Sequence, residues 1–278
     1  MDVQAALDTV AADAARGDII FSTHTEVALR VQRALDDPDC SIDRLSKLIS
    51  AEPMLAVRVV SIANSVAYNP SGRAMSDVRS AISRVGFKTL RTLATAVIVR
   101  QMQGMAQSPE HRALAARLWE HTAHVAALAR VIASRVTKQD PEVAFFAGIV
   151  HEVGGFYLIS RAAAFPGLFE SDLEAWYGEG EARVGRCILK ALDVPAEVVT
   201  ALEVLWAGYL AMPARSLGDT LLLADQLAPV ESPLAELDGM SRKDFVADMD
   251  IAVDDEMLSS ILAESAEEVE SLIAALKG

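Results

Sequence analysis

The stretch Phe145-Phe146-Ala147-Gly148-Ile149-Val150-His151-Glu152-Val153-Gly154-Gly155 decides the fold of the second half of the chain. It is an apolar helical segment that carries an adjacent imidazole and carboxylate, and we expect the helix to stop at the two glycines. Such a pair costs desolvation free energy on an apolar segment unless its members are hydrogen-bonded or bind a metal ion. The stretch therefore predicts either a buried polar contact or a metal centre.

Helical signals recur on both sides of this stretch, whereas no segment alternates polar and apolar residues for long enough to demand a strand. Ser41 is a predicted N-cap, and Pro53 fits the first turn of a helix. Gly86 is expected to close a short helix before a long apolar one over residues 87–102. Asp140-Pro141 is expected to begin the helix that contains His151. The sequence predicts an all-α fold.

The composition of the 278 residues excludes several classes of protein. A net charge of -14 argues against nucleic-acid binding, which depends on cationic side chains that displace counterions. Cys40 and Cys187 have no CxxC spacing, which is typical of a reducing compartment. The N-terminus lacks a signal-peptide pattern, and the uninterrupted apolar runs fall far short of the ~20 residues that span a bilayer. We expect a cytoplasmic protein without a membrane or nucleic-acid partner.

Three places in the chain offer candidate metal ligands. His121 and His124 share a helix face, His151-Glu152 lies on a later helix, and Asp225 follows later still. Imidazole and carboxylate ligands together suit first-row divalent metals. The alternative is that these side chains form a buried polar network that is fully hydrogen-bonded and fixes helix register without chemistry.

The order of the motifs along the chain resembles the HDOD domain, a relative of the HD-type metal-dependent phosphohydrolases. The resemblance spans most of residues 20–230. Its motifs are residues 39–49, Glu52-Pro53-Met54-Leu55, Val59-Val60-Ser61-Ile62-Ala63-Asn64-Ser65, Ala81-Ile82-Ser83-Arg84-Val85-Gly86, Leu118-Trp119-Glu120-His121-Thr122 and residues 145–154.

This resemblance implies two packed helical subdomains, of which the second is built like an HD domain. We expect the first subdomain over residues 1–105, the second over 106–235, and an acidic helical tail over 236–278 that packs on this module. In catalytic HD domains an early His, an adjacent His-Asp pair and a later Asp bind the metal. By matching motif, His121 corresponds to the early His, His151 and Glu152 to the pair, and Asp225 to the later Asp, while His124 has no counterpart.

Two departures from the catalytic pattern weaken the implied metal site. Glu152 replaces the Asp of the pair, and the added methylene moves the carboxylate by ~1.5 Å, comparable with the error that degrades a designed site. The helix after Leu192-Asp193-Val194-Pro195 lacks the histidine pair that two-metal relatives carry. A binuclear site is therefore not expected. We expect no cofactor, or at most a single divalent ion at a vestigial site.

Two functions remain open from the sequence. The first is a signal-transduction regulator of HDOD type that acts through protein–protein contacts with other signalling proteins and is not an enzyme. The alternative is a metal-dependent phosphohydrolase that acts on a nucleotide or phosphodiester with a reduced metal site. Trp206 and Tyr209 end a helix with two large amphipathic side chains, which would form a protein interface or cover the subdomain junction.

Overall fold

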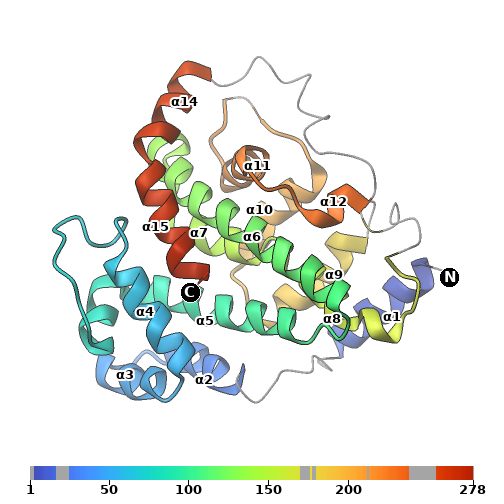
Figure 1. Ribbon diagram of the computed structural model, residues 1–278, viewed down its shortest axis with the longest axis horizontal. Coiled ribbons are helices and arrows are strands. Elements are labelled where there is room, and N and C mark those ends of the chain that lie inside the picture. Colours follow the sequence, from blue (N-terminus) through green and yellow to red (C-terminus); the bar gives the residue numbers. More distant parts are fainter. Residues whose placement is uncertain are drawn as a thin grey trace.

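The computed structural model describes residues 3–16, 25–169, 176, 180–211, 213–237 and 255–277. Across these residues all regular structure is helical, which confirms the predicted fold class. The helices pack around one continuous buried cluster rich in Ala, Leu, Ile and Val. Figure 1 shows how α6 and α5 run through the middle of the assembly, with the other helices on either side.

The first group of helices follows the start signals expected from the sequence. Ser41 caps α3 by accepting a hydrogen bond from the backbone N–H of Arg44, and Pro53 opens α4. The group comprises α2 (Thr25–Leu35), α3 (Ile42–Ser50), α4 (Pro53–Asn64) and α5 (Val78–Gly104).

Gly86 interrupts α5 as predicted. Its φ of 79° and ψ of 174° are non-helical, so a short first segment meets a longer one at this residue, and residues 89–99 of the longer segment are buried except for the half-buried Arg91. The short segment is capped by Asp77, whose side chain accepts a hydrogen bond from the backbone N–H of Ser80. α5 contacts α2, α3 and α4 of this group, and it also contacts α7 and α8.

The second group surrounds α6 (Pro109–Ile132), which Ser108 caps and which continues into the π-helical turn η1 (Ala133–Thr137). Asp140 caps α7 as expected, since its side chain accepts from two backbone N–H groups in the first turn. The remaining members are α7 (Pro141–Val150), α8 (Val153–Arg161), the 3₁₀ turn η2 (Ala162–Ala164), α9 (Glu181–Ala191), α10 (Ala196–Ala207), α11 (Leu217–Leu227) and α12 (Pro233–Leu237).

Both terminal helices pack on the second group, and the C-terminal one also reaches the first. α1 (Val3–Ala15) lies against α9, whereas α15 (Ala266–Lys277), preceded by α14 (Asp255–Glu264), lies along α6 and reaches α4 (Figure 1). The Ser271 hydroxyl accepts from the backbone N–H of Val66, and the Arg130 guanidinium donates to Glu268. The C-terminal helix thus joins the two groups. The division into residues 1–105, 106–235 and 236–278 stays a prediction.

The expectation that the apolar helix stops at Gly154-Gly155 is wrong. α7 ends at Val150, His151 and Glu152 form a turn, and both glycines lie inside α8. The glycines are required by close packing instead of by helix termination. A Cβ on Gly154 would lie 3.1 Å from the backbone nitrogen of Gly185.

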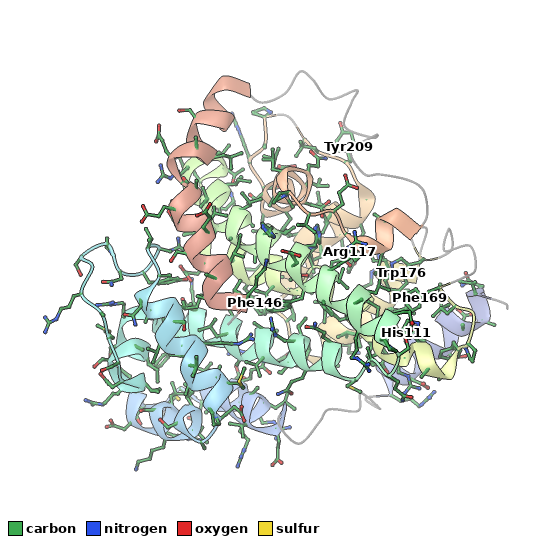
Figure 2. All side chains as sticks on the ribbon, viewed as in Figure 1. His111, Arg117, Phe146, Phe169, Trp176 and Tyr209 are labelled. Carbon is green, nitrogen blue, oxygen red and sulfur yellow. The ribbon has the colours of Figure 1, made fainter. Side chains whose placement is uncertain are left out.

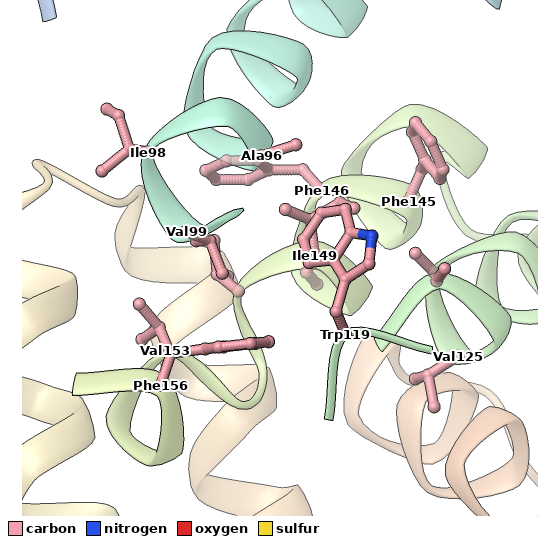
Figure 3. Close-up of a cluster of buried hydrophobic side chains, with 14 of the residues drawn as sticks. Ala96, Ile98, Val99, Trp119, Val125, Phe145, Phe146, Ile149, Val153 and Phe156 are labelled. Atoms are coloured by element: carbon pink, nitrogen blue, oxygen red, sulfur yellow. The ribbon is translucent and has the colours of Figure 1, made fainter. Parts of the chain in front are cut away.

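One stretch within the described ranges, Pro141–Ala164, is long and apolar enough to cross a membrane, with a mean hydropathy of 1.5. However, 89% of that window is buried inside the fold, and the turn at His151 divides it into two helices. Figure 3 shows its side chains Phe145, Phe146, Ile149, Val153 and Phe156 in the core beside Trp119 of α6. The stretch is the central core segment of the protein.

Candidate metal centre

Three separate elements bring the predicted ligands together. His121 comes from the middle of α6, His151 and Glu152 form the turn between α7 and α8, and Asp225 lies near the end of α11. All four are buried: their residues are 1%, 2%, 3% and 8% exposed, in that order. The turn after α7 therefore buries both His151 and Glu152. In a continuous helix, two consecutive side chains would point in different directions around the helix axis.

The rings of His121 and His151 approach each other through their Nε2 atoms. His121 Nε2 lies 3.1 Å from His151 Nε2. The other ring nitrogens are held by backbone carbonyls, because His121 Nδ1 donates to Val230 O at 2.8 Å and His151 Nδ1 donates to Gly148 O at 2.7 Å. A carbonyl only accepts, so each Nδ1 carries a proton and each neutral ring directs an Nε2 lone pair toward the other.

Asp225 completes one side of this arrangement, with its Oδ1 3.2 Å from His121 Nε2. Burial alone would lower the pKa of His121, but the hydrogen bond and charge of Asp225, with the charge of Glu152, raise it above its usual value. Burial, reinforced by the charge of His121, lowers the pKa of His151 to about 4.

The donor set fits a single divalent cation. His121, His151 and Glu152 each offer a ligand atom, and these atoms all lie within 4.8 Å of one another. Two nitrogens bound to one zinc ion at about 2.0–2.1 Å in tetrahedral geometry would be separated by roughly 3.3 Å, close to the distance between the two Nε2 atoms. The carbonyls at both Nδ1 atoms are the usual outer-shell partners of histidine ligands.

The centre is closed by the chain that follows α11. A Cβ on Gly155 would lie 2.7 Å from Leu234 Cδ1, 3.1 Å from Glu152 Oε2 and 3.2 Å from Leu118 Cδ2, so the two leucines lie close to this carboxylate. Val230, in the same segment as Leu234, provides the carbonyl that holds His121. Residues 228–234, which we call the covering segment, thus both orient one histidine and pack beside Glu152.

His124 does not take part. Its Nδ1 donates to Glu120 O, one turn earlier on α6, at 2.7 Å, and its side chain is half-buried. In the described part of the chain, His121, His151 and Glu152 form the only group of three or more ligand-type side chains with this mutual proximity. Arg186 of α9 forms an ion pair with Glu203 of α10.

Trp206 and Tyr209 differ in their surroundings. The Trp206 ring packs so closely on α9 that a Cβ on Gly185 would lie 2.7 Å from its Cζ2, and the Arg186 guanidinium lies 5.4 Å from the ring centre. Tyr209 is 76% exposed and points away from the helices (Figure 2). A protein interface at these two residues stays a prediction.

No sequence pattern marks Val230, Gly148 or Leu234 as neighbours of the candidate centre. The first two act through backbone carbonyls, and the third acts through packing on a glycine. Every residue other than proline carries the same backbone groups, so no residue type marks such a partner. The glycine at position 155 was the available signal, but a helix stop and a close approach both favour glycine.

Three solved structures share the fold of this chain. A candidate metal-dependent phosphohydrolase from Shewanella amazonensis SB2B is 22% identical, with a TM-score of 0.70 over 99% of this chain and 100% of its own. An HDOD domain protein with unknown function from Geobacter sulfurreducens is 23% identical, with a TM-score of 0.59 over 99% and 98% of the two chains. A candidate signal transduction protein from Marinobacter aquaeolei VT8 is 18% identical, with a TM-score of 0.58 over 100% of this chain and 67% of its own.

These identities establish a shared fold and not a shared activity. No curated protein matches the chain significantly. The sequence model of the HDOD domain matches residues 22–206, about two thirds of the chain, and includes His121, His151 and Glu152. The chain belongs to the HDOD domain family.

Proposed function

We propose that this chain is a cytoplasmic signal-transduction regulator that acts by contact with other signalling proteins and turns over no substrate. The observation that carries the proposal is the enclosure of the His121–His151–Glu152–Asp225 cluster. None of the four residues is more than 8% exposed. One of the similar folds belongs to a candidate signal transduction protein, which supports a role in signalling.

Hydrolysis of a phosphate ester needs the substrate to reach the position where a metal ion polarises a phosphoryl oxygen and activates water. Here Leu118 and Leu234 lie close to Glu152, and the Val230 carbonyl of the covering segment accepts a hydrogen bond from His121. The four side chains are buried in this conformation, so a substrate does not reach them. Catalytic metal sites, in contrast, keep one coordination position open to water or substrate.

The charges around the cluster also disfavour a phosphate substrate. The groups that shift the pKa values of His121 and His151 are each other, the two carboxylates and two backbone carbonyls. A phosphodiester would meet the Glu152 and Asp225 carboxylates, whose negative charge repels it.

The second candidate function is a metal-dependent phosphohydrolase, and one observation favours it. Both Nε2 atoms face the same point with their Nδ1 atoms fixed by carbonyls, an orientation suited to binding an ion. A bound divalent ion would supply Lewis-acid polarisation and a water of lowered pKa. In that case His121, His151, Glu152 and Asp225 would hold the ion, and the covering segment would have to move to admit a substrate.

Turnover by metal-loaded protein separates the two functions. The purified chain, loaded in turn with Mn²⁺, Fe²⁺ and Zn²⁺ and with its metal content measured, is assayed on bis(p-nitrophenyl) phosphate, nucleotides and a cyclic dinucleotide. We expect the rates to match those of His151→Ala. His124→Ala is the matched control, because His124 lies on α6 outside the cluster. Turnover that disappears in His151→Ala and persists in His124→Ala would establish the hydrolase instead.

A second arm tests regulation itself in cells with a phenotype that depends on this gene. Glu152→Gln removes a carboxylate charge that hydrolysis would need but keeps the shape of the side chain. A regulator that works by contact retains its output in this variant, provided that the protein accumulates to normal levels. Loss of output at normal protein level would contradict the proposal.

A further inference from the structure

Two arginines lie over the same tryptophan at the junction of α4, α5 and α6. The guanidinium carbon of Arg58, on α4, is 5.9 Å from the ring centre of Trp119 on α6, and that of Arg100, on α5, is 5.4 Å from it. Figure 3 shows the Trp119 indole deep between helices. The metal centre does not involve either arginine.

Arg58 is a buried cation without a counter-charge. The residue is 2% exposed, and its Nε and Nη1 have no hydrogen-bond partner in the described part of the chain. Burying a guanidinium is costly unless a carboxylate or another oxyanion compensates it. The groups that shift the pKa of Arg58 include Arg100 and no carboxylate.

Arg100 adds a second cation to the first. Among the described residues it has neither an ion pair nor a hydrogen bond, and it is half-buried, so the cluster reaches the surface beside it. Burial, together with the charge of Arg100, lowers the pKa of Arg58 to about 10, as expected for two cations without an anion. The indole Nε1 of Trp119 is a further buried donor that lacks a hydrogen-bond partner in the described part of the chain.

Among the described residues, these donors therefore gather at the junction without an acceptor for Arg58 Nε, Arg58 Nη1 or Trp119 Nε1. We propose that Arg58 and Arg100 form a binding site for a phosphate-class oxyanion, either free phosphate or the phosphate group of a small ester. The planar guanidinium fork matches phosphate oxygens in a bidentate manner, and two cations balance a dianion. The overall charge of -14 makes this a local feature and not part of a generally basic surface.

Because the site lies where three helices meet, a bound anion would hold these helices together. It would connect α4 and α5 of the first group of helices to α6, which carries His121. Ligand binding to the folded state alone stabilises that state in proportion to the logarithm of ligand concentration. Phosphate should therefore raise the thermal midpoint of the protein.

Calorimetric titration and thermal unfolding with inorganic phosphate and, separately, with AMP test the site, with sodium chloride at equal ionic strength as reference. We expect saturable binding of at least one probe. Arg100→Met should weaken it roughly ten- to hundred-fold, as for the loss of a charge-assisted contact. Arg79→Met is the matched control, because Arg79 is an exposed arginine of α5 paired with Asp43, and it should leave binding unchanged.

Arg58→Met provides an independent signature. Since Arg58 is buried without a counter-charge, its replacement by an apolar side chain of similar length should raise the thermal midpoint in phosphate-free buffer while it abolishes the phosphate response. A purely structural arginine would do the opposite. Tighter binding of AMP identifies an ester as the source, and equal or tighter binding of phosphate identifies the free ion. Binding of neither probe, or binding unchanged in Arg100→Met, would overturn the proposal.

Discussion

His121 and His151 meet through their Nε2 atoms, 3.1 Å apart, while each Nδ1 donates to a backbone carbonyl from a different part of the chain. The two backbone carbonyls orient both rings, and Asp225 adds a contact to His121 Nε2. The ligand geometry of a metal centre is thus retained, and the covering segment encloses it. Retained geometry and lost access together favour a structural centre over an active one.

Removal of His151 should cost stability and metal affinity together. His151→Ala leaves a cavity and an unmet Gly148 carbonyl, so we expect a loss of about 2–3 kcal/mol in the free energy of unfolding. Any bound divalent ion should fall to substoichiometric levels in metal analysis. His124→Ala should cost less than about 1 kcal/mol, because that side chain is half-buried and bonds only within its own helix. Equal losses in urea denaturation of the two variants would contradict the account.

A series of glycine replacements tests the packing around the centre. A Cβ on Gly148 would lie 2.4 Å from Ala126 Cα, a backbone atom, so α6 and α7 would have to separate. On Gly155 the nearest atom is the flexible end of Leu234, and on Gly104 nothing lies within 4 Å. We expect losses in unfolding free energy of about 4 kcal/mol for Gly148→Ala, about 1–3 for Gly155→Ala and none for Gly104→Ala. A different order in urea denaturation would show that the helices are spaced otherwise.

The docking of α15 depends on Arg130. Its Nη1 donates to Glu268 at 2.5 Å, and both side chains are largely buried. Glu268→Gln should weaken this contact by about 1–2 kcal/mol, which speeds amide hydrogen exchange in α15 roughly five- to thirty-fold. Glu267→Gln changes the same charge at an exposed position of α15 and should leave the exchange rates as they are. Unchanged exchange in both variants would mean that apolar packing alone holds the helix.

Asp219 should make stability depend on pH. Burial would raise the pKa of its carboxyl, but hydrogen bonds from Ser216, Arg215 and Ala211 outweigh burial and lower the pKa. Because the pKa of Asp219 is lower in the folded state than in the unfolded state, its ionised carboxylate stabilises the fold at pH values above the unfolded-state pKa. This stabilisation disappears as the pH falls below about 4. The free-energy difference between wild type and Asp219→Asn should therefore shrink between pH 5 and pH 3 (a range chosen around that value). A difference that stays constant across this range would be contrary to the assignment.

The sequence predicted the helices well where caps and prolines mark their first turns. Ser41, Pro53 and Asp140 all begin helices as expected, and Gly86 breaks α5. It failed at Gly154 and Gly155, because a glycine that ends a helix and one that admits a neighbouring backbone are the same in sequence. Only the three-dimensional path of α9 and of the covering segment distinguishes these cases.

The candidate site was predictable in its residues but not in its accessibility. The motif order singled out His121, His151, Glu152 and Asp225, and the fold brings His121, His151 and Glu152 within 4.8 Å, with Asp225 beside His121. Burial depends on Leu234 and Val230, which lie in a segment without a distinctive motif. The arginines over Trp119 were equally hidden, because an unpaired cation is recognised only when its neighbours are known.

The enclosure of the centre is measured most directly by histidine modification. Diethyl pyrocarbonate acylates accessible neutral imidazole, and peptide mass spectrometry reports the rate at each histidine of the native chain. The account predicts modification of the half-buried His111 and His124 while His121 and His151 stay protected until the protein unfolds. Modification of His151 at the rate of His111 under native conditions would show that the centre is open, and it would contradict the proposal that this protein works without catalysis.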